Sequence, residues 1–183
     1  MPFVHYRYNA ACIHLVRSPY AVVASQLRFT TYRDIKTVKD SRSYIKGPLA
    51  ERLHSLEVIS DIRNKEEMLT FWYCIHNAFS LLQAVDRTWH TVHYEDLHTK
   101  PMETYLSLSE FLNNRNIPII PFEVYEAGLT KPSATTQRES PFAVKKSFDP
   151  YSWRKELTKM QIDSITRILS HFGLSDLASD RWL

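Results

Sequence analysis

The sequence predicts an α/β fold built on a parallel sheet whose strands are separated by helices. Two segments, residues 12–16 and 89–97, have the composition of strands, and the apolar spacing predicts a long helix over residues 61–85 between them. Strands that alternate with helices favour a parallel sheet, in which ligands bind beyond the carboxyl ends of the strands. The chain has 183 residues, of which 44% are hydrophobic. We therefore expect a single domain over residues 1–183.

The first strand and helix lie in the segment CIHLVRSPYAVVASQL, residues 12–27. The apolar run over residues 12–16 is typical of a strand covered on both faces. Ser18 and Pro19 then form a helix start signal, because serine caps free amides and proline suits the first helical position. Arg17 ends the strand beside the positive end of the helix dipole, and its fork of donors suits an anion. The junction therefore predicts a phosphate site.

The middle of the sequence predicts a helix followed by a second strand. Apolar residues spaced by four and three form one face of the long helix: Met68, Trp72, Ile75, Phe79 and Leu82. The segment WHTVHYEDL, residues 89–97, has strand character and ends in an acidic turn. We interpret Glu95 and Asp96 in that turn as structural, since carboxylates cap helices and favour their N-termini.

The remaining sequence predicts three more helices. Pro101 opens a helix whose buried side is formed by Tyr105, Leu108, Phe111 and Leu112. Residues 113–150 hold five of the nine prolines, which favours irregular chain with one short helix over residues 122–127. Thr158 and Gln161 have capping-box spacing, and Gly173 suits the end of the last helix. Its expected buried face contains Met160, Ile162, Ile165, Ile168 and Leu169.

Composition excludes several classes of function. The net charge of +3, from 23 basic and 20 acidic residues, is too balanced for a nucleic-acid-binding protein. No stretch has the apolar length of a membrane span. Cys12 and Cys74 fall in a predicted strand and a predicted helix, so we expect buried free thiols rather than a disulfide or a metal site. The three glycines lack the spacing of a Walker loop, which argues against a nucleotide kinase.

The opening segment IHLVRSPYAVVAS resembles the 3′-phosphate-binding motif of sulfotransferases, in which a serine follows the strand-ending arginine by eight residues. Its sequence is most similar to that of the Golgi carbohydrate sulfotransferases, although Ser18 and Tyr20 replace their usual aspartate and second arginine. Two later segments, VHYEDLHTKPMETYLSLSEFL and SWRKELTKMQIDSITRILSHFGL, resemble later family elements in the same order. The resemblance implies a P-loop-NTPase-like parallel sheet flanked by helices, of the sulfotransferase type.

The same resemblance assigns residues to 3′-phosphoadenosine-5′-phosphosulfate, the cosubstrate of these enzymes. It places Arg17 and Ser25 on the 3′-phosphate and Tyr94 at the adenine, where packing on the sheet is the alternative role for the tyrosine. Lys146, with Lys145, matches a basic pair that closes over the phosphate, and solvation is the alternative for both. Thr130 is a further candidate for the adenine pocket. Trp153 is interpreted as a core residue.

The family's glycine-containing phosphosulfate loop has no counterpart in this sequence and would precede Met1 in family order. The sequence therefore predicts the C-terminal portion of a sulfotransferase-like domain, incomplete at the N-terminus and inactive alone. Its apolar strand edge favours a partner chain or a homodimer. His5 is the only histidine ahead of the strand and thus the candidate catalytic base.

The sequence leaves two functions open. The first is transfer of sulfate to a carbohydrate hydroxyl, without a metal. The second is a non-catalytic module that binds adenosine 3′,5′-bisphosphate or assembles with another chain. Family resemblance places such a protein in the Golgi lumen, with the cytoplasm as the alternative location.

Overall fold

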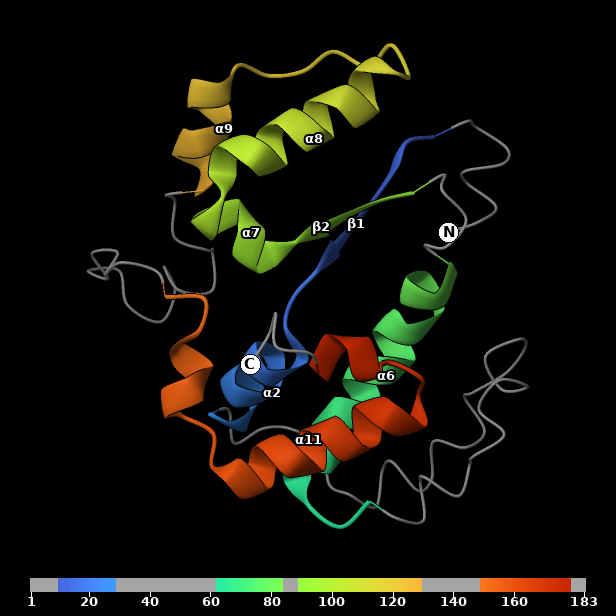
Figure 1. The fold of residues 1–183 in the computed structure, drawn as a ribbon, viewed down its shortest axis with the longest axis vertical. Helices are drawn as coiled ribbons and strands as arrows, with labels where there is room; N and C mark the ends of the chain where they lie inside the picture. Colours follow the sequence, from blue (N-terminus) through green and yellow to red (C-terminus); the bar gives the residue numbers. More distant parts are fainter. Residues whose placement is uncertain (1–9, 29–61, 84–88, 130–148, 179–183) are drawn as a thin grey trace. The chain divides into compact units, whose positions relative to one another are not determined.

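The computed structural model describes residues 10–28, 62–83, 89–129 and 149–178, with side chains of residues 78–83 not described (Figure 1). The chain divides into two compact units. We call residues 1–16 and 86–150 the sheet unit, and residues 17–85 and 151–183 the helical unit. The expectation of a single domain stays a prediction.

The sheet unit contains the two predicted strands as a parallel pair. β1 (Cys12–Val16) pairs with β2 (Trp89–His93), with Cys12 opposite Trp89 and Val16 opposite His93 (Figure 1). The chain is thus mixed α/β, mostly helical in its described parts, with a small parallel sheet.

The second strand is shorter than the sequence predicts. β2 ends at His93, and α7 (Tyr94–Thr99) begins at the next residue. Glu95 and Asp96 lie in the first turn of α7, where carboxylates interact favourably with the helix dipole. The acidic turn is therefore the start of a helix, in agreement with the structural role we assigned to this pair.

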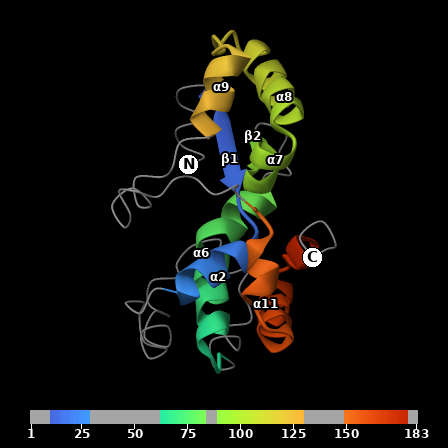
Figure 2. The same cartoon turned by 90° about the vertical axis from the view of Figure 1, so that its left-hand side faces the viewer.

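Aromatic contacts hold two further described helices of the sheet unit in place. Figure 2 shows α8 (Pro101–Asn113) beside β2 and α9 (Phe122–Leu129). The ring of Phe111 stacks on His90 of β2 at 4.9 Å between centroids. Tyr105 meets Phe122 edge-on at 5.2 Å, and its hydroxyl donates to the carbonyl of Ile120. The short helix predicted over residues 122–127 is confirmed and extends two residues further.

The prediction that β1 is covered on both faces is wrong for two residues. Ile13 is 47% exposed and Leu15 is 52% exposed, although Val16 is fully buried. Phe111 of α8 covers His90, the register partner of Ile13 on β2. The apolar run predicted the strand correctly. It contains no information on how much of the sheet α8 covers.

In the described part of the helical unit, three helices pack around one core. α2 (Pro19–Leu27), α6 (Lys65–Gln83) and α11 (Lys159–His171) pack against one another, as Figure 2 also shows. The short 3₁₀ segments η2 (Ser152–Lys155) and η3 (Ser175–Ala178) pack against α2 and α11. The largest fully buried side chains of this core are Tyr20, Val23, Met68, Leu69, Phe71, Ile165, Ile168 and Leu169.

Tyr20 joins two parts of this core. Its ring stacks on Trp153 with 4.8 Å between centroids, and its hydroxyl lies 2.8 Å from Thr166 Oγ1 on α11. Trp153 is only 2% exposed. The interpretation of Trp153 as a core residue is confirmed.

α11 begins and ends as its sequence predicts. Thr158 and Gln161 form the capping box, and Gly173 has a φ of 67°, which favours glycine after a helix. The buried face contains Ile165, Ile168 and Leu169. Met160 does not belong to it, since this side chain is 81% exposed.

α6 confirms the predicted long helix, but its buried face differs in part from the predicted one. Phe71 and Cys74 are buried beside Met68, whereas Trp72 only packs against the edge of the core. The side chains of Phe79 and Leu82 lie outside the described residues. Both cysteines are free thiols, Cys74 buried and Cys12 half-buried. Burial raises the pKa of Cys74, so this thiol stays protonated and unreactive.

Candidate functional site

Arg17 lies between β1 and α2, where the sequence predicts it. Its backbone carbonyl accepts a 2.8 Å hydrogen bond from the hydroxyl of Tyr73 on α6. Tyr73 is buried, with 6% of its surface exposed. The hydrogen bond therefore ties the residue that starts the candidate site to the core of the helical unit.

The start of α2 differs in one respect from the prediction. Ser18 is the N-cap residue, and its carbonyl accepts the first helical hydrogen bond from Val22 at 3.0 Å. Its side chain makes no capping hydrogen bond. The backbone of Ser18, rather than its hydroxyl, therefore starts the helix, together with Pro19 at the first helical position.

The first turn of α2 suits an anion better than those of most other described helices. The first turns of α6, α7, α8 and α9 each contain at least one acidic residue, which balances the positive end of the helix dipole. The first turn of α2 contains none. Arg17 precedes that turn, so its guanidinium and the helix dipole both favour a negative charge there.

Ser25 lies on the same face of α2 as the N-cap residue. It follows Ser18 by seven residues, which is nearly two full turns. Seven residues of α-helix span about 10 Å, the scale of a ligand lying along one helix face. Arg17 and Ser25 are both half-buried, so part of each residue remains accessible to solvent.

Tyr94 belongs to the sheet unit, whereas Arg17 and Ser25 belong to the helical unit. It directly follows His93, the register partner of Val16, and opens α7. Its half-buried ring meets His98 edge-on at 5.1 Å between centroids. Within its unit, Tyr94 thus combines a ring contact with partial exposure.

Four other candidate residues lie outside the described residues. These are His5, Thr130, Lys145 and Lys146. Their expected roles stay predictions.

Tyr73 is the site-supporting residue that the sequence did not reveal. A tyrosine on the buried face of a helix signals a hydrogen-bond partner for its hydroxyl. The sequence pattern cannot name that partner, because Arg17 lies 56 residues earlier in the chain. Only the packing of α2 on α6 brings the two groups together.

The described ranges show neither a metal-binding cluster nor a membrane-spanning helix. No group of three or more His, Cys, Asp or Glu side chains there is arranged to hold a metal ion. No described helix is both long and apolar enough to cross a membrane.

No protein-family model, curated protein or solved structure matches this chain. The strand-to-helix junction at Arg17 is therefore the main basis for a functional assignment.

Proposed function

We propose that this chain is a sulfotransferase-like protein that binds 3′-phosphoadenosine-5′-phosphosulfate and directs its sulfate to a carbohydrate hydroxyl. One observation carries the proposal. Arg17 directly precedes a helix start that has no acidic residue in its first turn, and Ser25 follows on the same helix. This is the arrangement that the motif resemblance implies for a 3′-phosphate site.

Each proposed contact follows from the chemistry of the side chain. Arg17 donates two parallel hydrogen bonds to the 3′-phosphate, and the Ser25 hydroxyl donates a third. The motif resemblance alone also assigns Tyr94 to the adenine and Lys146 to the phosphate. The carbohydrate acceptor and the Golgi lumen as the place of action come from the motif resemblance.

The transfer step exchanges one sulfur–oxygen bond for another. The acceptor hydroxyl oxygen attacks the sulfur while the bond between sulfur and the 5′-phosphate oxygen breaks. Adenosine 3′,5′-bisphosphate leaves with the bonding electron pair, and a general base takes the hydroxyl proton. Donors around the leaving group stabilise the charge that develops there, as in phosphoryl transfer. The residues proposed above hold the nucleotide, and His5 is the candidate base.

Titration calorimetry with adenosine 3′,5′-bisphosphate tests the nucleotide site. Arg17→Ala should weaken binding at least tenfold, a loss of about 1.4 kcal/mol that suits one charge-assisted contact. Ser25→Ala should weaken it by a smaller factor. Arg28→Ala is the matched control, because it removes an arginine at the opposite end of α2. The proposal fails if the chain does not bind, or if Arg17→Ala and Arg28→Ala weaken binding equally.

Sulfate transfer from labelled cosubstrate to a carbohydrate bears on the choice between the two candidate functions. Transfer by this chain that Arg17→Ala abolishes would support the enzyme and would contradict the expectation that the chain is inactive alone. Binding that depends on Arg17 without any transfer is expected both of a sulfotransferase portion that is inactive alone and of a non-catalytic module that binds adenosine 3′,5′-bisphosphate.

A further inference from the structure

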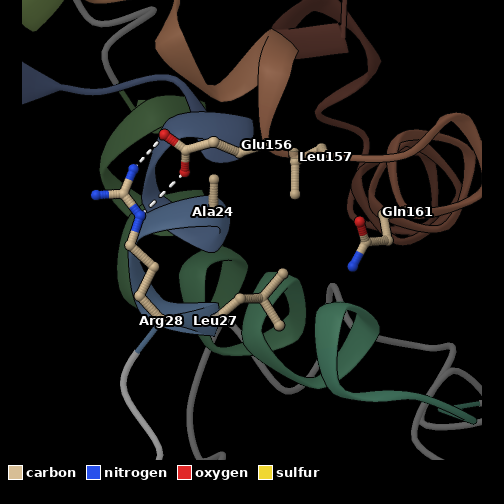
Figure 3. Close-up of a pocket in the computed structure, with 6 residues that line it drawn as sticks. All are labelled: Ala24, Leu27, Arg28, Glu156, Leu157 and Gln161. Carbon is tan, nitrogen blue, oxygen red and sulfur yellow. Dashed lines mark hydrogen bonds and ion pairs between the residues drawn. The ribbon is translucent and has the colours of Figure 1, made fainter.

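The helical unit contains a surface pocket on the side of α2 that carries Ala24 and Leu27. Its volume is about 540 Å³, within the range of small-molecule sites. The pocket is lined by Ala24, Leu27, Arg28, Glu156, Leu157 and Gln161 (Figure 3). We call it the α2–α11 pocket. None of the residues assigned to the nucleotide lines it.

One wall of the α2–α11 pocket is a neutralised ion pair. Arg28 Nε donates to Glu156 Oε2 at 3.0 Å, and a second nitrogen of Arg28 donates to the other carboxylate oxygen. Figure 3 shows this bidentate contact at the edge of the pocket. Because the two charges cancel, the wall offers hydrogen-bonding groups without attracting either a cation or an anion. Each carboxylate oxygen keeps acceptor capacity for a ligand hydroxyl.

The opposite wall is an amide held in a fixed orientation. Gln161 Oε1 accepts a 2.9 Å hydrogen bond from the backbone N–H of Thr158 as part of the capping box. That bond turns the nitrogen of the side chain toward the space beside Leu27 in Figure 3. The capping box thus gives the pocket a pre-oriented donor.

The surface between these walls is apolar. Ala24 and Leu157 are 4% and 7% exposed, and the Leu27 side chain lies between the two polar walls (Figure 3). An apolar surface flanked by an amide donor and a carboxylate acceptor matches a sugar ring. Such a ring has C–H groups on one face and hydroxyls at its edge.

We propose that the α2–α11 pocket binds an uncharged sugar ring. Ring hydroxyls donate to Glu156 and accept from the Gln161 amide, while ring carbons pack on Leu27 and Leu157. The inference deepens the proposed function, on which its biological meaning rests, by giving the carbohydrate a place on this chain. A charged sugar is disfavoured because it would have to compete with the Arg28–Glu156 pair.

Methyl NMR of the whole chain tests the pocket directly. Titration with N-acetylglucosamine or galactose to about 50 mM covers the millimolar affinities expected of a single sugar. We expect the Leu27 and Leu157 methyl signals to shift as sugar is added and to reach a plateau when the pocket is saturated. Glucuronate and glucosamine, which carry a negative and a positive charge, should shift them less.

Gln161→Glu is the decisive variant. Glutamate also suits the third position of a capping box, so α11 should keep its start. The pocket loses its amide donor and gains a negative charge, and sugar affinity should fall at least tenfold. Met160→Gln changes an exposed neighbour that does not line the pocket and should leave affinity unchanged. Glu156→Gln, which removes the acceptor charge from the other wall, should also weaken binding.

Three results would overturn the pocket assignment: no methyl shift with either neutral sugar, stronger binding of a charged sugar, or equal affinity in Gln161→Glu and the unaltered chain. Arg17→Ala separates this inference from the proposed function, since it should weaken nucleotide binding at least tenfold and leave the sugar titration intact. Nucleotide binding without sugar binding would refute only the pocket. Sugar binding without nucleotide binding would refute the proposed function and leave the pocket as a sugar site.

Discussion

The hydroxyl of Tyr73 donates a 2.8 Å hydrogen bond to the backbone carbonyl of Arg17. Tyr73 is a buried residue of α6, whereas Arg17 is half-buried and lies at the start of the candidate phosphate site. The contact makes Tyr73 a candidate positioning residue for the proposed phosphate site, since it reaches that site only through the backbone of Arg17.

Tyr73→Phe should lower both stability and nucleotide affinity. The variant keeps the ring but removes one buried hydrogen bond, so the free energy of unfolding should fall by about 1 kcal/mol. Affinity for adenosine 3′,5′-bisphosphate should fall severalfold, because the Arg17 backbone loses its tie to α6. Urea unfolding and calorimetry measure the two effects separately. A stability loss with unchanged affinity would show that Tyr73 only supports the fold.

Glu67→Gln should destabilise the helical unit in a pH-dependent way. Glu67 Oε1 accepts from Arg167 at 2.8 Å, and Oε2 accepts from the backbone N–H of Arg63 at 2.7 Å. Burial alone would raise the pKa of Glu67, but these hydrogen bonds outweigh it and hold the pKa below its usual value. At pH 7 the variant should lose about 1.5–3 kcal/mol of stability, the range for hydrogen bonds to charged groups.

The pH dependence of this loss has a defined sign. Because the pKa of Glu67 is lower in the folded state, its stabilisation is full above the unfolded pKa of about 4.3 and declines as pH falls through the folded pKa. The gap between the unaltered chain and Glu67→Gln in urea unfolding should therefore shrink at acidic pH. Glu66→Gln, a neighbouring acid in the same turn, is the matched control. A gap that stays constant from pH 7 to acid would contradict the charged role of Glu67.

His90 should titrate below its usual pKa. Its ring stacks on Phe111, and the guanidinium of Arg115 lies 3.9 Å from the centre of the same Phe111 ring. Burial lowers the pKa of His90, and the charge of Arg115 lowers it further. The neutral form of His90 is thus favoured in the folded state. The contribution of His90 to the free energy of unfolding is therefore full above its unfolded pKa of about 6.5 and declines as pH falls through the folded pKa.

NMR titration of the histidine ring signals measures this shift. Arg115→Gln should bring the His90 pKa closer to its usual value, whereas Arg154→Gln in the helical unit should leave it unchanged. A midpoint for His90 above pH 6.5 in the unaltered chain would contradict the packing on Phe111 and Arg115.

The sequence predicted most elements, because their signals are local. The capping box at Thr158 and the apolar run before Arg17 each depend on residues a few positions apart. The start of α7 was not predicted because Tyr94 is typical of a strand, while the acidic pair Glu95 and Asp96 suits a turn as well as the first turn of a helix. The exposure of Ile13 and Leu15 depends on how far α8 extends, and no local pattern contains that information.

The candidate site was predictable only in part. Arg17 and Ser25 follow from a motif of fixed spacing, and the structure places Arg17 one residue before the N-cap of α2 and Ser25 within that helix. Tyr73 and the Arg28–Glu156 pair depend on contacts between segments 56 and 128 residues apart. Such long-range contacts follow from packing and cannot be inferred from spacing along the chain.

The proposed contact between Arg17 and a 3′-phosphate can be tested most directly by removing each partner in turn. Calorimetry would compare adenosine 3′,5′-bisphosphate with adenosine 5′-monophosphate, which lacks the 3′-phosphate, on the unaltered chain and on Arg17→Ala. We predict at least a tenfold preference for the bisphosphate in the unaltered chain, about 1.4 kcal/mol, and near loss of this preference in Arg17→Ala. A preference that persists without Arg17, or that is absent from the unaltered chain, would contradict the assignment of this junction as a 3′-phosphate site.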